Sequence, residues 1–187
     1  MSSHLNLILE PDNPYNTNIH DEKDGRILYQ VMTEHGQEIV TKVKNIEGDI
    51  IACWQWRDPR PDIIALGTGQ PVPLGAWLKK SMMPFKESVT FEDGIGRHFK
   101  WKGLGTAPLP LELYSEDNKK HPIAQFVKSH SIFTSSPTDP SPSLQRVQAK
   151  LLVDERGQQI LDLVVVSFLV LEKNRRAIEN ATTMVGR

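Results

Sequence analysis

The stretch ILDLVVVSFLVL, residues 160–171, decides the fold, because only Asp162 and Ser167 in it are polar. As a helix it would span roughly 18 Å, whereas the hydrocarbon core of a bilayer is about 30 Å thick. The stretch is therefore too short for a membrane span, and we expect a core element that the rest of the chain surrounds.

Periodicity alone leaves both helix and strand open for this segment. Asp162 and Ser167 lie far apart around a helix and on opposite faces of a strand, and the valines favour a strand. Against a strand stand the length of the segment, the placement of Asp162 at the positive end of a helix dipole, and the basic residues that follow it. These basic residues are Lys173, Arg175 and Arg176.

Upstream of this segment, short β-like runs alternate with turn residues such as Asp24-Gly25 and Glu47-Gly48. Glycine permits positive φ in such turns, and the close spacing is typical of meanders and hairpins. The expected strands are residues 5–9, 27–33, 38–43, 49–56, 63–66, 90–91, 97–102, 110–114, 123–128 and 145–153. Helical spacing of apolar residues predicts a short helix over residues 74–80.

The run RHFKWK, residues 97–102, gives the clearest alternation of polar and apolar residues. Because successive side chains of a strand point to opposite faces, Phe99 and Trp101 are predicted to face the core. His98, Lys100 and Lys102 are predicted to face solvent.

Length and composition indicate a single domain over residues 1–187. At 21.2 kDa, with 39% hydrophobic and 24% charged residues, the chain can bury a core without metals or disulfides. The segment 134–143 contains three prolines and is rich in serine, so we expect a flexible surface loop there. We also expect a mobile tail at residues 177–187.

Charge and cysteine content restrict the classes of partner. The net charge is -1, which argues against a nucleic-acid-binding surface. The single Cys53 cannot form an internal disulfide and is expected to be a small core residue. The amino-terminal residues lack a signal-peptide pattern and no transmembrane segment is evident, so we expect a cytoplasmic protein.

Several pieces together resemble a fungal family of uncharacterised domains whose fold is similar to the tubby C-terminal and LURP-one-related domains. The pieces are DGR at 24–26, LYQVMT at 28–33, IIA at 50–52, the tryptophans at 54 and 56, TFEDG at 90–94, FKWK at 99–102, LDL at 161–163, SFLVLEK at 167–173 and RR at 175–176. The resemblance covers roughly residues 5–176. It implies a closed β-barrel of antiparallel strands around a buried apolar C-terminal helix, which agrees with the residue patterns.

Motifs for catalysis, cofactors or metals are not evident in the sequence. There is no nucleophile elbow, phosphate-binding loop or dinucleotide fingerprint, and the six histidines are scattered. We therefore predict no catalytic residues, no cofactor and no metal.

Basic residues form the candidate binding site. Tubby domains bind phosphoinositide headgroups through lysine and arginine, so the resemblance implies a phosphoinositide or another small ligand as partner. The candidate headgroup ligands are Lys42, Lys44, Arg97, Lys100 and Lys102, and Lys79 and Lys80 are further basic residues. The alternative is that these side chains only solvate the surface.

Three classes of function remain open, and the oligomeric state cannot be predicted. The first is a noncatalytic binding or interaction domain, with an anionic phospholipid headgroup as one candidate ligand. The second is a carrier of a small apolar molecule, suggested by Trp54, Trp56, Trp77, Trp101, Met82 and Met83. The third is an enzyme whose site has no sequence motif, for which a cleft joining His98 or His121 to a carboxylate would be evidence.

Overall fold

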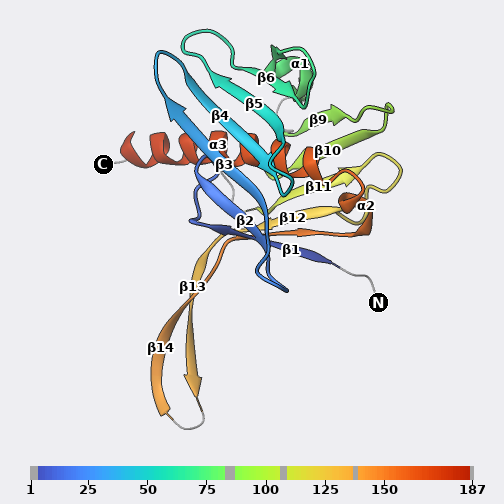
Figure 1. Cartoon of the computed structure of the whole chain (residues 1–187). Helices are drawn as coiled ribbons and strands as arrows, with labels where there is room; N and C mark the ends of the chain where they lie inside the picture. The colour runs from blue at the N-terminus through green and yellow to red at the C-terminus, as the bar shows by residue number, and fades with distance from the viewer. Residues whose placement is uncertain (1–3, 83–86, 106–108, 137–138, 186–187) are drawn as a thin grey trace.

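The computed structural model describes residues 4–82, 87–105, 109–136 and 139–185, and it is mainly β with one long C-terminal helix (Figure 1). The first strands are β1 (Leu5–Glu10), β2 (Thr17–Asp21), β3 (Ile27–His35), β4 (Ile39–Asn45), β5 (Ile50–Trp56), β6 (Ile63–Leu66) and β7 (Val72–Pro73). After the short helix α1 (Leu74–Trp77) come β8 (Lys79–Lys80), β9 (Val89–Glu92), β10 (His98–Lys102), β11 (Leu111–Ser115) and β12 (Ala124–Val127). The chain ends with β13 (His130–Ser136), β14 (Asp139–Val147), β15 (Lys150–Val153), α2 (Glu155–Gln158) and α3 (Leu161–Val185).

Thirteen of these strands form one large sheet in the order β7-β6-β5-β4-β3-β2-β1-β15-β12-β11-β10-β9-β8, and every pairing in it is antiparallel. The sheet curves around α3, so that β3 and β4 lie on one side of the helix and β10 to β12 on the other (Figure 1). Its two edge strands, β7 and β8, are consecutive in the chain and are joined through α1. Backbone pairing among the described residues therefore gives a sheet with two edges, where the sequence had led us to expect a closed barrel.

Residues 160–171 are the core element that the sequence predicts, and the element is a helix. α3 begins at Leu161, and every residue from Val164 to Leu171 is buried. The helix also continues through the expected tail, as far as Val185. None of the helices in the described part of the chain is long and apolar enough to cross a membrane.

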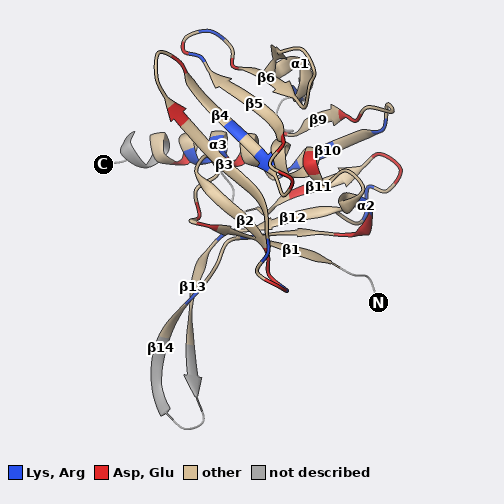
Figure 2. Cartoon of the chain, in the orientation of Figure 1, with Lys and Arg blue, Asp and Glu red and all other residues tan. Residues whose placement is uncertain are grey.

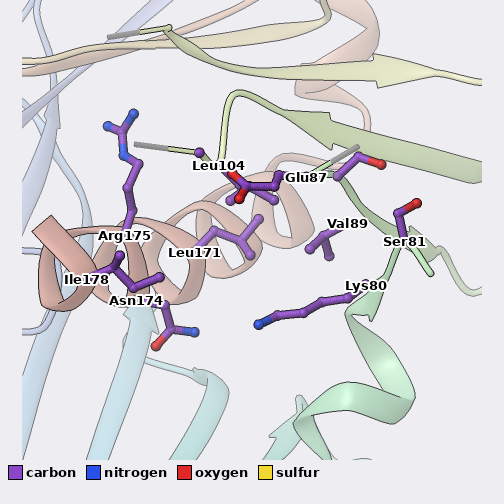
Figure 3. A pocket seen from close by; sticks show the side chains of 11 residues that line it. Lys80, Ser81, Glu87, Val89, Leu104, Leu171, Asn174, Arg175 and Ile178 are labelled. Atoms are coloured by element: carbon purple, nitrogen blue, oxygen red, sulfur yellow. The ribbon is translucent and has the colours of Figure 1, made fainter. Parts of the chain in front are cut away.

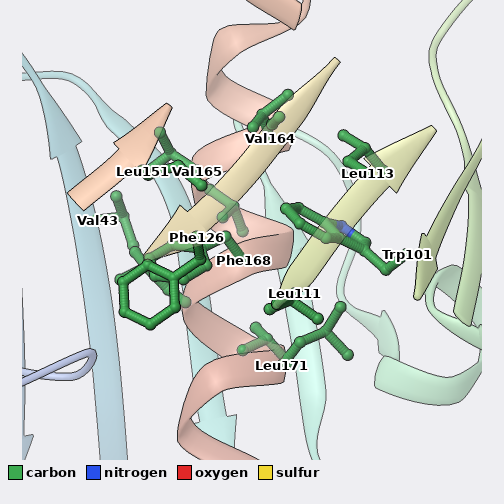
Figure 4. Packing of buried hydrophobic residues seen from close by; sticks show 14 of the residues in the cluster. Val43, Trp101, Leu111, Leu113, Phe126, Leu151, Val164, Val165, Phe168 and Leu171 are labelled. Atoms are coloured by element: carbon green, nitrogen blue, oxygen red, sulfur yellow. The ribbon is translucent and has the colours of Figure 1, made fainter. Parts of the chain in front are cut away.

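Side chains from widely separated strands converge on α3 (Figure 4). Val43 of β4, Trp101 of β10 and Leu151 of β15 are among those that pack around it. The rings of Phe126 and Phe168 lie 4.6 Å apart between centroids. The apolar surface of the helix is therefore covered from several directions, which explains why this segment is hydrophobic all round.

Strand β10 has the predicted orientation. Phe99 and Trp101 are buried, with 5% and 0% of their surface exposed, whereas His98, Lys100 and Lys102 are exposed. The indole nitrogen of Trp101 donates a hydrogen bond to Ser167 Oγ on α3 over 2.9 Å.

The segment expected as a loop lies instead in a two-stranded arm. Strands β13 and β14 pair only with each other in a separate sheet, and the arm projects away from the main sheet (Figure 1). The loop prediction was wrong because it relied on the low apolar content of the segment. Serine and threonine bury little surface, but they can still join an antiparallel ladder through their backbone groups. Residues 137 and 138, between the two strands, lie outside the described part of the chain.

Candidate binding pocket at the sheet edge

A pocket of about 240 Å³ lies where the edge strand β8 and its neighbour β9 meet α3. Its apolar wall consists of Val89, Leu104, Leu171 and Ile178. Figure 3 shows Val89 and Leu171 facing one another across the space. We call this space the edge pocket; its remaining lining residues are Lys80, Ser81, Glu87, Ser88, Gly105, Asn174 and Arg175.

The register of β8 places Lys80 on the inner face of the sheet. Lys80 pairs directly with Val89, which is 1% exposed and faces the core, and paired residues of an antiparallel ladder share a face. Lys79 pairs with Thr90 and therefore lies on the outer face. In Figure 3 the Lys80 side chain runs along the pocket and its ammonium group lies toward Asn174.

Lys80 has no acidic partner within the described residues. Its Nζ makes neither an ion pair nor a side-chain hydrogen bond there. Lys42 of β4 shows the contrast, because its Nζ lies 2.8 Å from both carboxylate oxygens of Glu34, and this hydrogen bond raises the pKa of Lys42. An inward lysine without a carboxylate is thus a charge that a ligand can reach.

Ser88 contributes a second polar group without a partner. The residue is 7% exposed, and its Oγ has no hydrogen-bond partner within the described part of the chain. A buried hydroxyl without a hydrogen bond costs free energy, on the order of 1–3 kcal/mol. A ligand atom in the edge pocket that accepts a hydrogen bond from this hydroxyl would remove the penalty.

Arg175 also lines the edge pocket, but it is already paired with a carboxylate. Its Nε donates to Glu172 Oε2 over 2.8 Å, and its Nη2 lies 2.6 Å from the same oxygen without making a hydrogen bond. Glu172 is fully buried, and its other oxygen accepts a 2.7 Å hydrogen bond from Arg176. Arg176 also binds Asp12, so this network fixes the helical wall of the pocket to the amino-terminal part of the chain.

The five basic residues proposed from the sequence do not lie together. Lys42 and Lys44 are on β4, whereas Lys100 and Lys102 are on β10, and the sheet order places six strands between β4 and β10. Figure 2 shows basic residues on β4 and acidic and basic residues interspersed over other parts of the chain. Arg97 precedes β10 and is bound by Asp93, with its Nε 2.6 Å from the carboxylate.

One of these lysines makes an aromatic contact. Lys102 Nζ lies 3.8 Å from the ring centroid of Tyr114, a cation–π geometry. Burial, together with a hydrogen bond to Glu112, raises the pKa of the Tyr114 hydroxyl to about 12. Tyr114 is therefore protonated at neutral pH and can act as a hydrogen-bond donor.

The tryptophans do not surround one common cavity. Trp54 and Trp101 are buried in the core, and none of the four tryptophans lines the edge pocket. Trp56 lines two open hollows of about 820 and 510 Å³. Met82 is 98% exposed, and Met83 lies outside the described residues.

Lys173 stands between the two hollows beside Trp56. Its Nζ lies 3.9 Å from the Trp56 ring centroid and 4.0 Å from Asp62 Oδ2. Burial lowers the pKa of Lys173, and the nearby Asp62 opposes this shift. Asp62 is held in turn by the indole nitrogen of Trp54 and the backbone of Arg57, so the cluster stabilises the β5–β6 hairpin.

His98 lines a hollow of about 490 Å³ together with Glu116 and Asp117, so a cleft that joins His98 to carboxylates is present, whereas His121 does not line it. His98 Nδ1 is 3.1 Å from Glu92 Oε1, and both side chains are about half exposed. His121 is exposed, and its backbone N–H donates a hydrogen bond to Asn118 Oδ1. Within the described residues, no three His, Cys, Asp or Glu side chains gather as a metal site requires.

Fold and pocket together define a mainly β protein in which a curved antiparallel sheet surrounds a C-terminal helix and leaves an apolar hollow at one edge. The chain belongs to DUF6593, a family of unknown function, whose profile matches residues 12–177. Comparisons with curated proteins and with solved structures gave no significant match.

Proposed function

We propose that this protein is a noncatalytic binding domain that carries a small, mainly apolar molecule in the edge pocket. The observation that supports the proposal most strongly is the apolar wall of Val89, Leu104, Leu171 and Ile178 around about 240 Å³. At roughly 30 Å³ per water-sized group, such a space holds about eight heavy atoms. Binding sites for small molecules have this character, an apolar wall with a few polar groups.

The neutral probe 1-octanol matches this size and tests the proposal by isothermal titration calorimetry. Leu104→Trp should abolish the binding heat, because the indole would fill the pocket. Leu144→Trp is the matched control, since Leu144 is 63% exposed on the arm and lies outside the pocket. No binding of 1-octanol to the unmodified protein, or equal binding by both variants, would refute the proposal.

Binding of an anionic phospholipid headgroup by Lys42, Lys44, Arg97, Lys100 and Lys102 stays a prediction. An inositol ring carrying several phosphates exceeds the roughly eight heavy atoms that the edge pocket holds. A headgroup would therefore bind at the outer surface, by one of the two separate groups of lysines. A cytoplasmic location is likewise a proposal.

A closed, tubby-like barrel is the architecture that we propose for the sheet. The support is topological: the edge strands β7 and β8 follow one another in the chain, and the four-residue helix α1 joins them. Both edges consist of two residues only, and short edges limit pairing with other chains. Protection of the amides of β7 and β8 from hydrogen exchange would support closure.

A further inference from the structure

We infer that the molecule in the edge pocket is an anion, with a carboxylate that pairs with Lys80 and accepts a hydrogen bond from Ser88. This inference rests on the proposed function, and it specifies the chemical class of the ligand. A medium-chain carboxylic acid has the required charge, and the carbon chain of an eight-carbon acid matches the space; its two carboxylate oxygens bring the total to about ten heavy atoms.

The position of Lys80 is the first support. Lys80 is exposed, so its ammonium group is hydrated, and a ligand in the pocket can reach it. Alternation sends Lys79 outward and Lys80 inward toward the pocket, although both residues belong to the same two-residue strand. The inward ammonium group lies beside the apolar wall, so one ligand can contact both.

Hydrogen-bonding capacity is the second support. Ser88 Oγ is buried without a partner among the described residues, and its hydroxyl can donate to a carboxylate oxygen. Asn174 lines the same pocket and carries an amide donor. Charge-assisted bonds from such donors are stronger than those between neutral groups.

The two other ionic groups in the lining limit how the ligand can lie. Arg175 is paired with the buried Glu172, which Arg176 shares, whereas Lys80 has no carboxylate partner among the described residues. Glu87 is exposed and lies across Leu171 from Lys80 in Figure 3. Its carboxylate would repel an anion, which directs the carboxylate of the ligand to the Lys80 side.

Calorimetry with three probes of equal length, octanoate, 1-octanol and octylamine, tests the inference at pH 7.5. Octanoate should bind most tightly and octylamine most weakly. Lys80→Met, which keeps the length of the side chain and removes its charge, should weaken octanoate binding about three- to tenfold and leave 1-octanol unchanged. Lys79→Met is the matched control and should change neither.

Two further variants make the prediction sharper. Glu87→Gln should strengthen octanoate binding because it removes a repulsive charge, and Ser88→Ala should weaken it. Equal affinities of octanoate and 1-octanol, with no effect of Lys80→Met, would overturn the inference but leave the proposed function intact. If none of the three probes binds, the proposed function fails as well.

Self-association gives a separate control. An inward lysine on an edge strand can also serve to prevent pairing with another chain. If Lys80→Met self-associates while its octanoate affinity stays unchanged, Lys80 protects the edge and the inference is wrong.

Discussion

Replacing Trp101 by alanine should be one of the most damaging single changes in the sheet. Trp101 is completely buried, it lies opposite Leu113 and Val89 on the neighbouring strands, and it donates to Ser167 of α3. Truncation of a buried tryptophan costs about 3–5 kcal/mol, because apolar contacts are lost and a cavity remains. Ser167 keeps its own partner, since its hydroxyl donates to the carbonyl of Leu163 over 2.6 Å.

The loss is large relative to the stability of an ordinary domain, which is about 5–15 kcal/mol. With a urea m-value of about 2 kcal/mol/M, the midpoint of unfolding should fall by about 2 M. Urea titrations followed by tryptophan fluorescence and by circular dichroism measure this shift and show whether the two transitions coincide.

Lys100→Ala is the matched control, because Lys100 is next to Trp101 but lies on the solvent face. It should change the free energy of unfolding by no more than about 0.5 kcal/mol. Similar losses for the two variants would refute the register that we describe for β10 and the position of α3 against it.

Three other predictions concern pH, the turn at Gly103 and membranes. Burial and a hydrogen bond to Asp162 raise the pKa of Tyr29 in the folded protein. The stability that this shift contributes is complete below about pH 10, the pKa of tyrosine in the unfolded chain, and it is lost progressively as the pH rises above that value. Tyr29→Phe should therefore cost about 1 kcal/mol at pH 8 in urea titrations, and this cost should shrink by up to about 1.4 kcal/mol per pH unit above pH 10; a constant difference would contradict the assignment. Gly103→Ala should destabilise the protein by more than about 1 kcal/mol in thermal unfolding. The reason is that φ is +83° and a Cβ would lie 2.0 Å from the Pro110 carbonyl oxygen. Unchanged stability would show that this turn is open. If the protein binds phosphoinositide vesicles in sedimentation, Lys100→Glu with Lys102→Glu should weaken that binding, whereas binding insensitive to both changes would exclude β10 as the headgroup site.

Strong periodic patterns in the sequence predict the core well. The apolar run of residues 160–171 predicts a buried element, and alternation places Phe99 and Trp101 inside. Such patterns succeed because burial of a whole face fixes the register of a strand. Strand β2 shows the opposite case: Ile19 is its only large apolar residue, so no alternation marks it, and pairing with β1 and β3 decides its structure.

The candidate site was not predictable in the same way. Lys80 belongs to a strand of two residues, which is too short for any alternation, and only its pairing with Val89 shows that it faces inward. The absence of a hydrogen bond to Ser88 Oγ among the described residues is a property of the folded structure that no sequence pattern marks. Conversely, Lys42 and Lys100 look alike in the sequence, but the sheet order separates them.

Methyl NMR during titration with octanoate tests the central claim most directly, because it reports where in the molecule a ligand binds. We predict saturable shifts of the methyl groups of Val89, Leu104, Leu171 and Ile178, which line the edge pocket. Methyl groups of the arm, such as those of Leu144, should not move. Shifts absent from the four pocket residues, or centred on the hollows beside Trp56, would contradict the account.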